Sequence, residues 1–176
     1  MITGERVTLR AVRPEDYPAI YEWRTALDTW GDTSDKPAFP WAYADFVAYM
    51  DRLVADPERA AEWAVETRDG ELVGRATMFS FDPLSRNAEV GLVLAPEHRG
   101  RGYGREVLRM LLEFGFTHRN LHRVWLETTS TNERALRSYA AAGFVEEGRL
   151  REHAWVAGRY VDMVRMAVLR REWEAS

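Results

Sequence analysis

The segment LAPEHRGRGYGR, residues 94–105, combines residue types that bind anions. Its glycines alternate with basic side chains, and a glycine lets backbone N–H groups approach a ligand without a side chain in between. Residues 87–94 predict a strand, and the helical spacing of Val107 and Leu111 predicts a helix that begins near Gly102. The unpaired N–H groups and the dipole of a helix start favour a phosphate. The segment therefore predicts a pyrophosphate site, with a solvated glycine-rich turn as the alternative.

The spacing of the glycines excludes two other phosphate-binding motifs. A P-loop ends in Gly-Lys-Ser or Gly-Lys-Thr, and this segment contains neither. A dinucleotide-binding fingerprint reads G-x-G-x-x-G and follows its strand closely. Here Gly100, Gly102 and Gly104 give G-x-G-x-G, and residues 96–99 separate them from the strand.

The elements that must position this segment predict a mixed α/β domain, because strand-like alternation and helical periodicity occur in turn along the chain. In chain order we expect a strand at 5–12, helices at 14–23 and 42–55, strands at 61–67, 72–78 and 87–94, a helix at 102–119, a strand at 123–128, a helix within 130–143, and strands at 145–156 and 159–168. Asp69-Gly70 is the strongest hairpin signal. Ser130 and Glu133 have the spacing of a capping box, and Gly143 is suited to end that helix.

Composition limits the class of protein. A chain of 176 residues, 46% hydrophobic and 30% charged, suits one globular domain over residues 1–176. The absence of cysteine excludes disulfides and a thiol nucleophile, and the four histidines have no spacing typical of metal ligands. A net charge of −4 argues against nucleic acid as a partner. No apolar run suits a signal peptide or a membrane span, so we expect a cytoplasmic protein.

Two motifs carry a resemblance to a known family. Arg99-x-x-Gly102-x-Gly104, after a strand and at a helix start, resembles the R/Q-x-x-G-x-G/A signature of the GNAT superfamily of N-acyltransferases. The run N-x-x-A-x-x-x-Y-x-x-x-G-F from Asn132 to Phe144 is similar to that superfamily's second element. The C-terminal residues resemble the branch that contains ribosomal-protein N-terminal and spermidine acetyltransferases. The resemblance covers nearly the whole chain and is weakest at 25–60. It implies an α+β fold with a mixed, mostly antiparallel sheet of about six to seven strands and about four flanking helices.

The resemblance also implies acetyl-CoA as cosubstrate. The strand at 87–94 should splay from the strand at 123–128, and Asn132 should touch the pantetheine arm. Tyr139, on the same helix face, should point its phenol at the thioester sulfur. An N-cap role for Asn132 and a packed aromatic role for Tyr139 are the alternatives. The residues expected to bind the cofactor through backbone or side chain are Leu92, Val93, Leu94, Arg99, Gly100, Arg101, Gly102, Tyr103, Gly104, Arg105 and Asn132.

Attack of an amine on a thioester requires the neutral amine. A lysine-like amine has a reference pKa of about 10.4 and is mostly charged at pH 7, whereas a peptide α-amine, at about 7.7 to 8.0, is much less so. A catalytic base is therefore more useful for a lysine-like amine than for a peptide α-amine. Glu127 and Glu89 are the candidates; the spacing of Glu127 from Tyr139 resembles that in some ribosomal-protein acetyltransferases, and Glu89 can act through water. Either carboxylate can instead be a solvated strand residue.

The acceptor is less well defined. Trp30 and Asp32 lie in a loop whose aromatic and acidic residues suit a cationic amine, and equally suit an exposed loop. Trp155 suits either the acceptor pocket or a contact in a homodimer. We expect transfer of acetyl by direct attack in a ternary complex to a primary amine, either a protein N-terminus or a small amine such as a polyamine, amino acid or antibiotic. The rival is a non-catalytic acyl-CoA-binding sensor or interaction module.

Overall fold

The computed structural model describes residues 1–27, 30 and 38–175. Its eight-stranded sheet contains β1 (Ile2–Thr3), β2 (Val7–Ala11), β3 (Ala60–Thr67), β4 (Leu72–Asp82), β5 (Asn87–Leu94), β6 (Arg123–Thr129), β7 (Val145–Val156) and β8 (Arg159–Leu169). The α-helices of the described residues are α1 (Tyr17–Thr25), α3 (Tyr43–Ala55), α4 (Tyr103–Glu113), α5 (Glu133–Ala141) and α6 (Arg170–Glu174). Short 3-10 turns, Pro14–Asp16 and Pro96–His98, precede α1 and α4, and a π-helical turn, Phe114–His118, follows α4.

The strands lie in the order β1-β2-β3-β4-β5-β6-β8-β7, and only the β5–β6 pair is parallel. The expected mixed, mostly antiparallel sheet is confirmed, with one strand more than the upper expectation. The additional elements are the two-residue β1 and the five-residue α6, which are too short to show a period in the sequence. No helix among the described residues has the length and apolar character needed to cross a bilayer.

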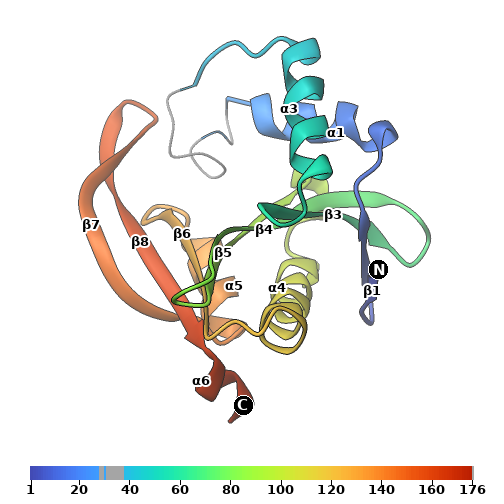
Figure 1. The fold of residues 1–176 in the computed structure, drawn as a ribbon. Coiled ribbons are helices and arrows are strands. Elements are labelled where there is room, and N and C mark those ends of the chain that lie inside the picture. The colour runs from blue at the N-terminus through green and yellow to red at the C-terminus, as the bar shows by residue number, and fades with distance from the viewer. Residues whose placement is uncertain (28–29, 31–37, 176) are drawn as a thin grey trace.

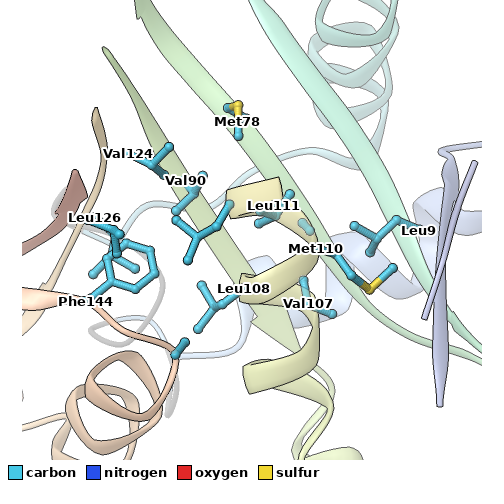
Figure 2. Close-up of a cluster of buried hydrophobic side chains, with 14 of the residues drawn as sticks. Leu9, Met78, Val90, Val107, Leu108, Met110, Leu111, Val124, Leu126 and Phe144 are labelled. Carbon is cyan, nitrogen blue, oxygen red and sulfur yellow. The ribbon is translucent and has the colours of Figure 1, made fainter. Parts of the chain in front are cut away.

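Helices cover both faces of the sheet, with α1 and α3 on one side and α4 on the other (Figure 1). The main core lies between the sheet and α4, where Leu108 and Leu111 pack against Val90 of β5 and Leu126 of β6 (Figure 2). A second apolar cluster joins α1 and α3 to β3 and includes Phe46. Because side chains alternate along a strand, the neighbours of Val90 and Leu126 in sequence point toward the α1 and α3 side.

The strands β5 and β6 pair only at their beginnings. Their register starts with Asn87 opposite Arg123 and ends with Glu89 opposite Trp125; no further pair joins them in the described residues, although both strands continue. The separation that the family resemblance implies is therefore present, and we call it the fork. Past Glu89, the edge of β5 that faces β6 has backbone groups that need partners from elsewhere.

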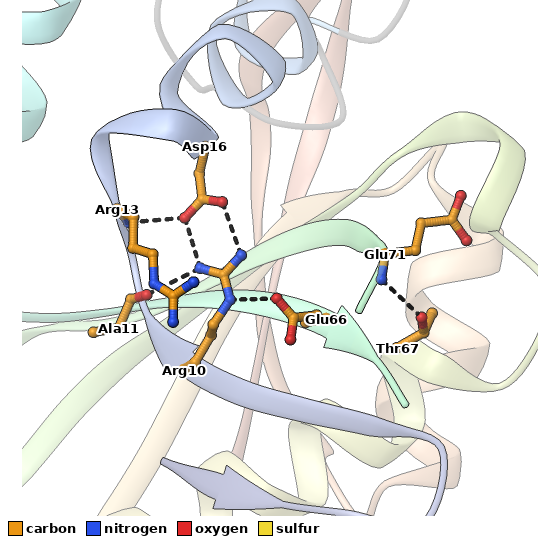
Figure 3. Close-up of polar contacts among 7 residues, drawn as sticks. All are labelled: Arg10, Ala11, Arg13, Asp16, Glu66, Thr67 and Glu71. Atoms are coloured by element: carbon orange, nitrogen blue, oxygen red, sulfur yellow. Dashed lines mark hydrogen bonds and ion pairs between the residues drawn. The ribbon is translucent and has the colours of Figure 1, made fainter. Parts of the chain in front are cut away.

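A buried ion network ties the start of α1 to the sheet (Figure 3). The guanidinium of Arg10 on β2 donates to both carboxylate oxygens of Asp16, at 2.7 and 2.9 Å, and through Nε to Glu66 on β3. The backbone N–H of Arg13 also donates to Asp16, at 2.8 Å. Burial by itself raises the pKa of Asp16, but the hydrogen bonds from Arg10 and Arg13 outweigh burial and hold that pKa below its ordinary value.

The network generates a stability prediction for Asp16→Asn. The substitution removes one of the two carboxylates paired with the buried Arg10 while Glu66 remains, so the free energy of unfolding at pH 7 should fall by about 1–3 kcal/mol, measured by urea denaturation. Because the folded-state pKa of Asp16 is depressed, its contribution is present above the unfolded pKa of about 3.9 and is lost as pH falls through the lower folded value. The difference between wild type and variant should therefore shrink below about pH 4.

Asp69→Asn is the matched control, because it makes the same change in an exposed Asp-Gly turn where Asn-Gly is equally suited. Its stability should remain close to that of the wild type. Equal stability of Asp16→Asn and wild type at pH 7 would contradict a stabilising role for the network.

Candidate active site

The helix α4 begins at the glycine segment, as the sequence predicts. Gly100 and Gly102 have φ values of +79° and +86°, in the left-handed region that only glycine adopts easily. Gly102 is the N-cap residue of α4. Because glycine has no side chain, this N-cap cannot accept hydrogen bonds from the N–H groups of the first turn. Those N–H groups are left for water or for an anion.

A groove of about 320 Å³ lies beside this helix start, and we call it the glycine cleft. It is bounded by the end of β5, the glycine segment and one face of α5. The Nε atom of Arg99 donates to the carbonyl of Leu94 at 3.0 Å, which holds this arginine at the end of β5. The lining residues expected from the sequence are Leu92, Val93, Leu94, Arg99, Gly100, Gly102, Gly104, Arg105, Asn132 and Tyr139.

Two expected cofactor residues are placed differently. The ring of Tyr103 packs against the main core, and Arg101 is exposed and donates to the carbonyl of Glu97; neither is among the residues that line the glycine cleft. Their backbone N–H groups still belong to the segment at the helix start. A backbone contact with a ligand therefore remains a prediction for both residues.

The start of α5 corrects one local prediction. Asn132 is the N-cap, and its side-chain oxygen accepts from the N–H of Ala135 at 3.2 Å. The expected capping box of Ser130 and Glu133 is therefore wrong, because the helix begins two residues later than that box requires. Asn132 caps the helix and also lines the glycine cleft, so the structural role does not exclude contact with a ligand.

Sequence reasoning missed the contribution of α5 to the glycine cleft. Arg134, Arg137 and Ser138 line it, and they lie at i, i+3 and i+4 on one helical face. That spacing was a readable signal, but only the pairing of α5 with α4 shows which way the face points. The groove thus has arginines on both sides, a charge pattern suited to phosphates.

A second space of about 800 Å³, which we call the large cavity, lies on the α1 and α3 side of the sheet. Its lining includes Glu89 and Glu127. Leu92, Val93 and Tyr139 line both the large cavity and the glycine cleft. The two spaces therefore meet at the fork, where β5 and β6 no longer close the sheet.

Tyr139 occupies this junction. It projects from α5, packs against the main core, and has its ring centroid 6.2 Å from that of Phe144. Both alternatives left open by the sequence thus have structural support. The ring is packed against the core, and the residue also lines both spaces.

The two candidate bases flank the fork. Glu89 is the last residue of β5 that pairs with β6. Its partner on β6 is Trp125, and Glu127 lies two residues further along β6. An ion pair holds Glu127, whose Oε1 accepts from Nε of Arg165 at 2.7 Å. The carboxylate of Glu127 is therefore already bound on one oxygen.

A buried hydroxyl that the sequence did not single out also lines the large cavity. Thr128 on β6 is 6% exposed, and its Oγ1 has no hydrogen-bond partner among the described residues. A buried hydroxyl without a partner costs about 1–3 kcal/mol. Thr128 is therefore a candidate contact for a polar group bound in the fork.

Of the expected acceptor residues, the structure describes Trp30 and Trp155. Trp30 is half-buried, with its ring 5.6 Å from that of Phe39, and it does not line either described space. Asp32 lies outside the described residues. Trp155 is 63% exposed and packs edge-on against Tyr160 at the β7–β8 turn, and it too lines neither space. In the described part of the chain, no group of three or more His, Cys, Asp or Glu residues could hold a metal ion.

Comparison with known proteins agrees with this geometry. Residues 6–145 match the family model described as the acetyltransferase (GNAT) domain. Spermidine N(1)-acetyltransferase of Vibrio cholerae is 35% identical over 63% of this chain and 64% of that relative's length. The Escherichia coli K12 protein of the same name is 29% identical over 99% of this chain and 92% of the relative. The crystal structure of the Vibrio cholerae spermidine N-acetyltransferase with CoA and spermine superimposes with a TM-score of 0.88 at 27% identity, covering 96% of this chain and 98% of that one.

The chain therefore belongs to the GNAT acetyltransferase family. It is an acyl-CoA-dependent N-acetyltransferase that uses acetyl-CoA as cosubstrate and an amine as acceptor. The non-catalytic binding module receives no support from these relatives.

The glycine cleft generates a binding prediction for Gly104→Val. A Cβ at Gly104 would lie 3.5 Å from side-chain carbons of Leu92 and Leu94 and 3.6 Å from Oγ of Ser138, which are ordinary contacts. The fold should therefore tolerate the substitution, while the branched side chain fills space in the cleft. Calorimetry should show at least about a tenfold loss of acetyl-CoA affinity, equivalent to about 1.4 kcal/mol.

Gly148→Val is the matched control, because Gly148 lies on β7 and a Cβ there meets nothing within 4 Å. Gly102 is unsuitable for this test, since its positive φ strains any other residue. Unchanged acetyl-CoA affinity in a folded Gly104→Val protein would remove the cleft from the cofactor site.

Proposed function

We propose that acetyl-CoA occupies the glycine cleft, that a small-molecule primary amine enters the large cavity, and that the amine attacks the thioester directly in a ternary complex. The observation that carries this proposal is the junction of the two spaces at Leu92, Val93 and Tyr139. A thioester in the fork would be open to the amine from the opposite face of the sheet. No acetylated enzyme is then needed between the two substrates.

The proposed cofactor contacts follow from the fork and the helix start. The unpaired edge of β5 beyond Glu89 offers the pantetheine arm the backbone donors and acceptors that β6 no longer supplies. The pyrophosphate would accept hydrogen bonds from N–H groups around Gly102, while the surrounding arginines add positive charge.

The proposed reaction forms a C–N bond and breaks the C–S bond. The amine nitrogen adds to the thioester carbonyl, the thiolate departs, and the nitrogen loses a proton, which gives an N-acetyl amine and the CoA thiol. An acceptor that arrives as an ammonium ion must lose a further proton before the attack. A base on the acceptor side and an acid at the sulfur would both assist.

For these roles we favour Glu89 as the base, acting through water, and Tyr139 as the acid. Glu89 lines the large cavity and is the last residue of β5 that pairs with β6, so it lies where the fork begins. Glu127 remains the alternative base. Tyr139 lines both spaces and so is the proposed proton donor for the departing thiolate.

The names of the relatives, which have spermidine as substrate, make a polyamine one candidate acceptor. A protein N-terminus, the other acceptor expected from the sequence, is the second candidate. A homodimer and a cytoplasmic location also stay proposals. Exposure of Trp155 and Tyr160, 63% and 64%, supports a protein contact at the β7–β8 turn rather than a role for Trp155 in the acceptor site.

Tyr139→Phe tests the acid. The variant keeps the packed ring and removes only the phenol O–H, so acetyl-CoA affinity and thermal stability should change little. The kcat should fall by roughly a hundredfold, the usual scale for general acid catalysis. Tyr43→Phe, an exposed tyrosine on α3 that lines neither space, is the control. Near-normal kcat for Tyr139→Phe would show that Tyr139 is only a packed aromatic.

Glu89→Gln and Glu127→Gln separate the two candidate bases. A variant that lacks the base should lose most rate at low pH, where few acceptor molecules are neutral, and should partly recover at high pH. The pH dependence of kcat/KM with one alkylamine acceptor measures this. We expect the pattern in Glu89→Gln and a smaller effect, uniform with pH, in Glu127→Gln; the reverse would assign the base to Glu127.

A further inference from the structure

The charged side chains that line the large cavity are arranged unevenly. Next to the fork lie the carboxylates of Glu89 and Glu127. Away from the fork the lining contains the arginines Arg24 and Arg75 and the exposed pair Glu58 and Arg59, which are adjacent in sequence just before β3. The cavity thus presents carboxylates near the proposed reaction centre and guanidinium groups on another part of its lining.

The buried carboxylate on the arginine-bearing part of the cavity, that of Glu62, is already bound. Glu62 forms an ion pair with Arg75 at 2.8 Å, and the side chains are 3% and 6% exposed. The other oxygen of Glu62 accepts from Oγ1 of Thr77 at 2.9 Å. With both oxygens engaged, Glu62 is poorly placed to bind an ammonium group of a substrate.

Arg24 has a different environment. It belongs to the last turn of α1, and its guanidinium carbon lies 5.8 Å from the ring centroids of both Trp41 and Tyr49. No ion pair joins Arg24 to a carboxylate within the described residues. Burial lowers the pKa of Arg24, and the positive charge of Arg75 lowers it further. An anion beside Arg24 would offset the cost of keeping this cation away from water.

We infer that the acceptor is a small amine that also carries a carboxylate, with its amine at the fork and its carboxylate on Arg24. This inference rests on the proposed function of the large cavity as the acceptor site. A diamine or polyamine in the same orientation would bring a second ammonium group toward Arg24 and Arg75, which like-charge repulsion disfavours. Arg24, which forms no ion pair among the described residues, matches one carboxylate better than a doubly charged phosphate.

Three acceptors that differ only at the far end of the chain test the inference: 6-aminohexanoate, hexylamine and 1,6-diaminohexane. CoA thiol release should give kcat/KM at least about tenfold higher for the carboxylate than for hexylamine, the scale of one charge-assisted hydrogen bond, and lowest for the diamine. The same comparison with the four-carbon series, 4-aminobutanoate, butylamine and 1,4-diaminobutane, removes dependence on one chain length. A preference for the diamines in both series would overturn the inference.

Variants of Arg24 identify the residue responsible. Arg24→Gln should reduce the ratio of kcat/KM for 6-aminohexanoate to that for hexylamine from at least about ten to about one, and Arg24→Lys should restore part of the ratio. Arg52→Gln, an exposed arginine on α3 outside both spaces, is the matched control. An unchanged preference in a folded Arg24→Gln protein would overturn the assignment.

Binding to the protein saturated with CoA separates this inference from the catalytic proposal. In this complex no acetyl group is present, so calorimetry reports recognition of the acceptor alone. Tighter binding of 6-aminohexanoate than of 1,6-diaminohexane, lost in Arg24→Gln, would support the inference even if no amine in the panel were acetylated. Turnover of the diamines without binding of the aminoalkanoates would leave the catalytic proposal intact and overturn the inference. The inference would also be overturned if neither 6-aminohexanoate nor 4-aminobutanoate bound.

Discussion

The structure depends on the loss of backbone pairing between β5 and β6 after Glu89 and Trp125. Strands in the interior of a sheet normally satisfy each other's N–H and C=O groups, and a break in the middle leaves those groups without strand partners. The two strands stay in one sheet beyond this point, because side chains of both strands pack into the main core. It provides backbone donors and acceptors and a passage through the sheet at the same place.

Successive side chains of β5 lie on opposite faces of the sheet, so the two sides of that passage are lined by different residues. Val90 faces the core and α4, so Glu89 points toward the large cavity. The glycine segment and α5 complete the opposite side, where backbone N–H groups and arginines gather. The sheet thereby separates a space lined by backbone N–H groups and arginines from one that contains the carboxylates of Glu89 and Glu127. Tyr139 and the end of β5 are shared by both.

The position of Arg24 in the large cavity depends on contacts that α1 and α3 make with the sheet. Arg24 reaches the large cavity from α1, and the Arg10–Asp16 network holds the beginning of that helix against β2 and β3 (Figure 3). Burial of Phe46 in the second apolar cluster fixes α3 beside it. The position of one arginine in the cavity is thus coupled to an ion network and to an apolar cluster that hold α1 and α3 on the sheet.

The sequence by itself determined the local backbone and the cofactor motif. Gly100 and Gly102 adopt left-handed conformations, which glycine permits, and the strands and longer helices follow periods that can be read within a few residues. The capping box at Ser130 failed because neighbouring Ser, Thr and Asn residues can each cap a helix, and sequence alone does not choose among them. Only the tertiary structure decided the rest. The fork requires strand pairing between segments that are distant in sequence. Arg75 pairs with Glu62 and Arg24 packs on aromatic rings, and this difference depends on which residues of α1, β3 and β4 face one another.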